Sequence, residues 1–295
     1  MSTIVASNLY ASGGAGTAAT LASVNGGPIA GTRNRIINGG TAVDQRNAGA
    51  SQTFTAGAAL AYTVDRWYAY STGANVTGQR VTGASAGQYR YQFTGAASVT
   101  GIGFGQRIET LNSADLAGTT ATLSVDLANS LLTTVTWTAY YANTTDTFGT
   151  LASPTRTQIA TGTFTVTNTV TRYNAQISVP AAAVTGIEIV LSVGAQTSGT
   201  WTIGNVQLEA GSVATPFERR SYGQELFLSQ RYYYQNNIYV STNASCYSVH
   251  PAPMRATPTR TGGGGGYVQS FLDANGQAAI QTTGASALLT FFAEL

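Results

Sequence analysis

Cys246 and His250 are the one cysteine and the one histidine of the sequence, and both would lie on one face of an extended strand. A thiol beside an imidazole can form a reactive thiolate, so the pair is a candidate for covalent catalysis. A lone cysteine on a strand is more often a small core residue, however. One cysteine and one histidine also fall short of the four ligands of a usual zinc site. We therefore interpret both residues as structural.

Carboxylates could instead carry hydrolysis, but the sequence does not pair them. The 12 acidic residues are spread from Asp44 to Glu294, and a glycoside hydrolase needs two carboxylates held about 5–10 Å apart. There is also no internal repeat of the kind that builds a long β-helix. We expect no enzymatic activity and keep a capsular polysaccharide depolymerase as an alternative.

A structural calcium ion is the one cofactor that the sequence allows us to place. Calcium binds carboxylate, amide and carbonyl oxygens. Asn38, Asp65 and Glu209 carry such oxygens and fall at the ends of expected strands. We take these three residues as the candidate calcium ligands.

Aromatic residues are the best candidates for binding a sugar, since sugar rings stack on aromatic faces. The chain has 16 tyrosines and three tryptophans. Trp67, Trp137 and Trp201 are in phase with apolar neighbours or flanked by them, which predicts that they belong to the core. Tyr68 and Tyr70 are out of phase with Trp67, so we expect them to be exposed and available to a glycan.

A dense cluster of charge and aromatic residues occupies 214–237, "ATPFERRSYGQELFLSQRYYYQNN". Ser221 and Gln224 have the spacing of a capping box, which predicts that a short helix begins here with an apolar stripe containing Tyr222. We interpret the cluster as a joint whose charges pair within the chain or between subunits, and we expect Arg219 to support assembly or stability there. The joint residues are Phe217, Glu218, Arg219, Arg220, Glu225, Arg231, Tyr232, Tyr233 and Tyr234.

The elements that position these residues are mostly strands. From Arg33 onward apolar residues alternate with polar ones, as in "TATLSVDLA" and "TVTWTAYY", which is the pattern of half-buried strands. The pattern predicts an all-β protein. Its parts are an extended N-terminal arm (1–32), an antiparallel jelly-roll β-sandwich (33–213), a linker with one α-helix (214–231) and a small C-terminal β domain (232–295). Asn275-Gly276 is a hairpin signal within the last part.

Charge and hydropathy exclude several partners. Charged residues make up 9% of the 295-residue chain, every cation is arginine, and the formal net charge is +2. So small and scattered a positive charge argues against nucleic acid. No stretch reaches the roughly 18 apolar residues of a membrane-spanning helix. The first ten residues lack a secretory signal pattern, so we expect no membrane insertion and no secretion.

Five segments, in order along the chain, carry a resemblance to a known family. They are "NRIINGG" (34–40), "VDRWYAY" (64–70), "NVQLEAGSVATPFERRSYGQEL" (205–226), "SQRYYY" (229–234) and "HPAPMRATPT" (250–259). Together they resemble a family of tailed-bacteriophage virion proteins, known as tail fibre, head fibre or minor structural proteins. The middle domain of that family is similar to carbohydrate-binding-module jelly rolls. "NRIINGG" resembles the first strand of such modules and "TWTIGNVQLEAG" (200–211) the last.

The resemblance implies a structural protein of the virion that is assembled in the host cytoplasm. It implies a homo-oligomer, with a trimer favoured, in which the arm 1–32 binds another capsid or tail protein. The sandwich would present a glycan-binding-like module to a host cell-surface glycan. An alternative is a capsid decoration or stabilising protein that binds no glycan. The family offers no catalytic motif.

Overall fold

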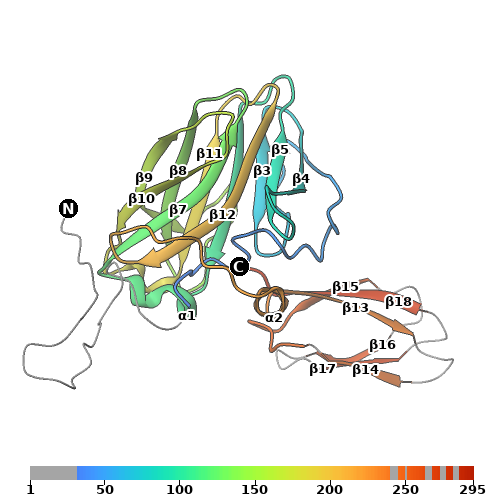
Figure 1. The fold of residues 1–295 in the computed structure, drawn as a ribbon. Helices are drawn as coiled ribbons and strands as arrows, with labels where there is room; N and C mark the ends of the chain where they lie inside the picture. Colours follow the sequence, from blue (N-terminus) through green and yellow to red (C-terminus); the bar gives the residue numbers. More distant parts are fainter. Residues whose placement is uncertain (1–31, 240–244, 250, 263–267, 273–276, 282–285) are drawn as a thin grey trace, which may run out of the picture.

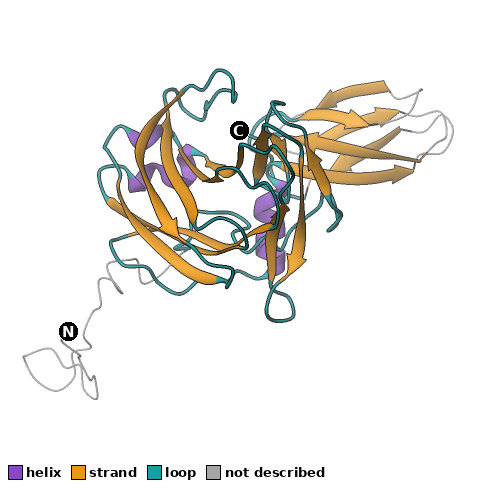
Figure 2. Ribbon diagram, turned by 90° about the horizontal axis from the view of Figure 1, so that it is seen from above, coloured by secondary structure: helices purple, strands orange, loops and turns teal. Residues whose placement is uncertain are grey.

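The computed structural model describes residues 32–239, 245–249, 251–262, 268–272, 277–281 and 286–295. A large β-sandwich is followed by the helix α2 (Tyr222–Gln230) and then by a smaller β unit that extends to one side (Figures 1 and 2). The expected arm falls almost wholly outside the described residues. Among the described helices, none is long and apolar enough to cross a membrane.

The sandwich consists of two antiparallel sheets, each of six described strands. The first has the order β1-β4-β5-β12-β7-β10. Its strands are β1 (Gln52–Phe54), β4 (Val76–Thr82), β5 (Tyr89–Thr94), β12 (Thr200–Ala210), β7 (Thr120–Asn129) and β10 (Thr171–Ser178). The second has the order β2-β3-β6-β11-β8-β9. Its strands are β2 (Ala61–Tyr62), β3 (Tyr68–Thr72), β6 (Gly101–Ile108), β11 (Ile187–Val193), β8 (Thr134–Ala142) and β9 (Arg156–Thr165). Short helical turns interrupt the connections: α1 (Thr110–Ser113), η1 (Ala114–Leu116) and η2 (Ala183–Thr185). The predicted all-β antiparallel sandwich is confirmed.

The core lies between the two sheets and has aromatic rings at its centre. Trp67 stacks on Phe104 with ring centroids 4.5 Å apart, and Phe93 stacks on Trp201 at 5.4 Å. Such contacts add to the free energy gained by burying the rings. Trp137 is also buried. The prediction that all three tryptophans belong to the core is confirmed.

The segment expected to be the first strand has no regular secondary structure, yet it runs beside β12. The Arg35 amide donates to the Leu208 carbonyl at 2.8 Å, and the Val206 amide donates to the Gly39 carbonyl at 2.9 Å. β12 has a bulge between Gly204 and Gln207, which leaves the Val206 amide available for this contact. A Cβ on Gly39 would lie 2.1 Å from the Val206 carbonyl oxygen, so only glycine permits this approach.

The helix α2 begins as predicted but buries a different face. Ser221 and Gln224 form the complete capping box. The buried residues of α2 are Glu225 and Ser229, whereas Tyr222 is 59% exposed. The expected apolar stripe is therefore wrong, because Glu225 anchors the helix through polar contacts to the sandwich.

The second β unit pairs its strands in two three-stranded sheets within the described residues. One contains β13 (Tyr233–Tyr239), β18 (Ser286–Phe292) and β15 (Thr259–Gly262); the other contains β14 (Ser245–Val249), β17 (Gln277–Gln281) and β16 (Val268–Leu272). β16 and β17 are antiparallel partners, as the hairpin signal predicts, although Asn275-Gly276 itself lies outside the described residues.

A buried ionic contact joins the second unit to the sandwich. Arg66 is 1% exposed and ion-pairs with Glu294, which also lies 2.7 Å from Arg46. The Arg66 guanidinium lies 3.5 Å from the centroid of the Tyr232 ring, so the cation also gains a cation–π contact. Arg46 lies 3.6 Å from the ring of Tyr233 in the same way.

We expect Glu294→Ala to lower the free energy of unfolding by about 3 kcal/mol, because it leaves two buried guanidinium groups without their shared carboxylate. Urea unfolding monitored by tryptophan fluorescence measures the change. Asp115→Ala is the control: it removes the exposed partner of Arg35 and should cost less than about 1 kcal/mol. Equal losses for the two variants would contradict the importance of the buried contact.

Candidate functional site: a hollow at the junction

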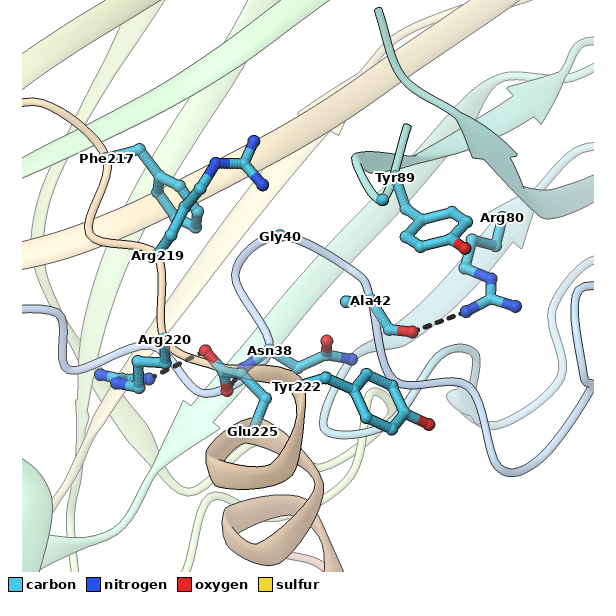
Figure 3. A pocket seen from close by; sticks show the side chains of 11 residues that line it. Asn38, Gly40, Ala42, Arg80, Tyr89, Phe217, Arg219, Arg220, Tyr222 and Glu225 are labelled. Atoms are coloured by element: carbon cyan, nitrogen blue, oxygen red, sulfur yellow. Dashed lines mark hydrogen bonds and ion pairs between the residues drawn. The ribbon is translucent and has the colours of Figure 1, made fainter. Parts of the chain in front are cut away.

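A hollow opens where the sandwich meets α2, and we call it the junction hollow. Its volume is about 470 Å³. Three segments line it: the 38–42 loop, the β4–β5 hairpin, and the 217–225 segment that leads into α2 (Figure 3). It is therefore built by parts of the chain that are far apart in sequence.

One wall is the β4–β5 hairpin. Tyr89 at the start of β5 and Arg80 near the end of β4 lie together, with the guanidinium 4.4 Å from the ring centroid. Arg80 also donates to the Ala42 carbonyl at 2.6 Å, and its Nε lies 3.9 Å from Asp44. Tyr89 is thus held in place at the side of the hollow.

The opposite wall is the segment that leaves β12. Phe217 lies against Gly40, where a Cβ would be 3.5 Å from its ring. Arg219 lies 5.9 Å from the same ring and is exposed. In Figure 3 its guanidinium lies beside the Phe217 ring, on the side away from α2. Tyr222, at the first position of α2, borders the hollow from below in the same view.

The base is closed by a buried polar contact. The Glu225 carboxylate accepts a hydrogen bond from the backbone amide of Asn38 at 2.7 Å and pairs with Arg220 at 3.2 Å. Arg220 also donates to the Ile36 carbonyl. Burial raises the pKa of Glu225, and Arg220 opposes that rise. The carboxylate is fully engaged in holding α2 against the 38–42 loop.

The chemistry of this arrangement is that of binding. Aromatic faces from Tyr89, Tyr222 and Phe217 can stack against the apolar face of a sugar ring. Arginine side chains at the rim can donate several hydrogen bonds. Glu225 is the one acidic side chain among the described lining residues, so no pair of carboxylates faces the hollow.

A second hollow of about 270 Å³ lies on the outer face of β5 and β12. Arg90, Gln92 and Thr202 are among its lining residues, and no described lining residue is aromatic. We call it the Arg90 hollow. It offers hydrogen-bonding groups but no stacking surface.

The expected exposure of Tyr68 and Tyr70 is wrong for Tyr68 and only partly met for Tyr70. Tyr68 is 1% exposed, and its hydroxyl donates to Glu188 at 2.6 Å. Tyr70 is half-buried. A Cβ on Gly103 would fall 2.2 Å from the Tyr70 ring, and one on Gly105 would fall 2.5 Å from the Tyr68 hydroxyl. Both rings therefore pack against the glycines of β6, and the buried Tyr68 leaves no face open to a sugar.

A salt-bridge cluster covers the outer face of the second sheet, where Tyr68 and Tyr70 lie. Arg107 pairs with Glu188 at 2.8 Å, and Arg156 pairs with the other oxygen of the same carboxylate. The alternating glycines in "GIGFG" (101–105) are the sequence signal for this packing, because a strand face without side chains invites neighbouring rings to cover it.

Hydrogen bonds within the protein engage the side chains of the three candidate calcium ligands. The side-chain amide of Asn38 donates to the carbonyls of Val43 and Asp65, and its oxygen accepts from the backbone amide of Val43. The Asp65 carboxylate accepts from Gln45. The Glu209 carboxylate accepts from Thr215 and Gln207. These hydrogen bonds engage the oxygens without a metal ion, and the shared calcium ion stays a prediction. Among the described residues no group of three His, Cys, Asp or Glu residues could hold a metal ion.

The nine joint residues make contacts within the chain, and four of them line the junction hollow. Arg220, Glu225, Arg231, Tyr232 and Tyr233 make contacts within the chain: Arg231 pairs with Glu109 at 3.0 Å, and Tyr232 is buried beneath Arg66. Glu218 accepts from the amides of residues 33 and 34, Tyr234 stacks on Phe291, and Phe217 and Arg219 line the junction hollow.

The structural interpretation of His250 and Cys246 stays a prediction. His250 lies outside the described residues, and for Cys246 only its place in β14 is described.

Tyr89 and Arg80, which form one wall of the junction hollow, were not predicted as site residues. Their sequence neighbourhood carries no signal for this, since the hollow depends on long-range contacts.

The sequence matches no protein-family model and no curated protein. Solved structures with a similar jelly-roll sandwich include a family 61 carbohydrate-binding module in complex with β-1,4-galactotriose. It is 14% identical with a TM-score of 0.38, over 61% of this chain and 99% of that one. The C-terminal family 22 carbohydrate-binding module of Clostridium thermocellum Xyn10B is 12% identical with a TM-score of 0.35, over 51% and 89%.

A phage protein is also among the similar structures. The enzymatically active domain of tailspike protein 4 from bacteriophage CBA120 is 20% identical with a TM-score of 0.35, over 49% of this chain. The matched part spans 19% of the tailspike chain. All three likenesses concern the fold alone.

The pH dependence of stability tests the description of Asp65. Burial raises the pKa of Asp65 to about 6, against the opposing effects of Arg46 and of the Gln45 hydrogen bonds. Between pH ~4 and pH ~6 the unfolded chain therefore releases the proton more readily than the folded one, and stability falls as pH rises. We expect wild type to lose about 2–3 kcal/mol relative to Asp65→Asn over this range. Urea midpoints at several pH values measure it. A difference that stays constant, or that changes in the opposite direction, would contradict the raised pKa.

Proposed function

We propose that this protein is a non-catalytic attachment protein of a bacteriophage virion that binds a host-surface glycan in the junction hollow. The observation that carries the proposal is the hollow itself, in which three aromatic side chains and the exposed Arg219 surround about 470 Å³. A concave site with stacking surfaces and a few polar groups is what a sugar ligand requires.

The geometry of the walls supports binding without large rearrangement. Tyr89 is held by Arg80, and Phe217 lies between Arg172 and Arg219, each 5.9 Å from its ring. The Glu225–Asn38 hydrogen bond fixes the base. Side chains already held in place lose little conformational entropy on binding, which favours affinity.

The absence of catalysis is part of the proposal. Glu225 lines the hollow without a second carboxylate among the described residues, whereas glycoside hydrolysis uses two. A polysaccharide depolymerase acting at this hollow is therefore the weaker alternative.

The virion setting rests on the sequence resemblance in "NVQLEAGSVATPFERRSYGQEL" and the four other segments. In this setting the protein is a homotrimeric fibre, on either head or tail, anchored by residues 1–32 to another virion protein. Several copies would then bind weakly and together gain avidity.

A capsid decoration protein without a glycan ligand is the second candidate. Leu111 is 84% exposed and Phe227 is 48% exposed. Exposed apolar side chains of this size favour contact with another protein, so this candidate assigns them to a virion interface.

We expect Tyr89→Ala and Tyr222→Ala each to weaken glycan binding about fivefold or more, because each removes a stacking face from the hollow. A glycan array followed by titration of the best ligand measures the loss. Phe227→Ala is the matched control, since it removes an exposed aromatic of the same helix that does not line the junction hollow. Equal effects of Phe227→Ala and Tyr222→Ala, or binding unchanged in both tyrosine variants, would remove the glycan site from this hollow.

We expect deletion of residues 2–32 to abolish incorporation into virions while leaving the sandwich folded, because the described contacts of the core begin after this segment. Immunoblots of purified particles measure incorporation, and circular dichroism of the free protein is the control. Normal incorporation of the folded truncated protein would show that the arm is not the anchor.

A further inference from the structure

Arg219 differs from the other described arginines that line the junction hollow. Among the described residues its guanidinium makes no ion pair. It does lie near the Phe217 ring, whose centroid is 5.9 Å away. Arg220 is paired with Glu225, and Arg80 lies near Asp44 and donates to the Ala42 carbonyl. Arg219 is thus the lining cation whose charge no described carboxylate offsets.

The position of Arg219 makes its charge available to a ligand. The side chain is exposed and extends over the hollow, across from Tyr89 (Figure 3). The Phe217 ring supports the guanidinium from one side, which leaves its N–H edges open. A guanidinium presents its donors in a planar fork that matches the two oxygens of a carboxylate.

The one acidic lining residue does not oppose such a ligand. Glu225 is 6% exposed and its carboxylate accepts from the Asn38 amide and from Arg220. Its charge is offset at the base of the hollow, below the level at which Arg219 and Tyr89 face each other.

We propose that the junction hollow selects acidic glycans, with Arg219 binding the carboxylate of a uronic or sialic acid residue while Tyr89 or Tyr222 stacks on a sugar ring. This inference rests on the proposed glycan-binding function and adds the chemical class of the ligand. Arg219 is then a specificity-determining residue. Because Arg219 is exposed and has no ion pair among the described residues, we expect its loss to leave stability unchanged, which differs from the role predicted for it in the joint.

Trigalacturonic acid and its methyl ester test the proposal, because esterification removes the negative charge of the carboxyl groups and keeps the same sugar rings and linkages. We expect the full-length protein to bind the acid about tenfold more tightly than the ester in isothermal titration. Arg219→Gln should remove this preference, because it weakens binding of the acid about tenfold, and should leave the melting temperature unchanged. Added salt should weaken binding of the acid by wild type but not binding of the ester. Sialyllactose and lactose, compared in the same way, distinguish a sialic acid from a uronic acid as the source of the carboxylate.

Arg33→Gln is the matched control, since it makes the same charge change at an arginine that has no ion pair among the described residues and does not line the hollow. It should keep the preference for the acid. Equal binding of acid and ester by wild type would overturn the inference while leaving a neutral-glycan site in place. A preference for the acid that survives Arg219→Gln would also overturn it, because the preference would then not depend on Arg219. If no acid or neutral probe binds wild type at millimolar concentration, the acidic-glycan inference is overturned. The glycan array on Tyr89→Ala and Tyr222→Ala then decides the proposed function separately.

Discussion

The arrangement of the two β units depends on one buried cation. Arg66 has its backbone in the left-handed region, with φ 73°, a conformation that costs a non-glycine residue of the order of 1 kcal/mol. Its side chain is buried, pairs with Glu294, donates to the Arg107 carbonyl and lies over Tyr232. A guanidinium removed from water is tolerated only when a carboxylate and other acceptors offset its charge. Because these partners come from both units, satisfying Arg66 fixes the second unit against the sandwich.

The junction hollow is a consequence of the same packing. The 38–42 loop lies between β12 and α2, tied to β12 through Gly39 and to α2 through the Asn38 amide. Its far side is held by Arg80 through the Ala42 carbonyl. The loop therefore cannot fill the space between Tyr89 and Phe217. The hollow is kept open by hydrogen bonds rather than by a rigid element of secondary structure.

The sequence was sufficient for what depends on local pattern. Alternation along β7 and β8 predicted the sandwich, and Ser221 with Gln224 predicted the start of α2, because both signals act over a few residues. It was insufficient where long-range contacts decide. Tyr68 was expected outside because of its phase, but Glu188, 120 residues away, covers it. Glu225 reads as a first-turn acid of a helix, yet its partner Asn38 lies 187 residues away. Nothing near Tyr89 indicates that Phe217 would face it.

The fold combines a sandwich held by buried charges with the junction hollow at its surface. Buried charges, such as Glu225 and Glu294, serve the frame, while Arg219 and the exposed aromatics are left for a ligand. The most direct measurement is an experimental structure of the protein with a bound acidic oligosaccharide. The account predicts an intact sugar in the junction hollow, stacked on Tyr89 or Tyr222 with its carboxylate against Arg219. An ordered sugar only in the Arg90 hollow, or a cleaved one in the junction hollow, would contradict it.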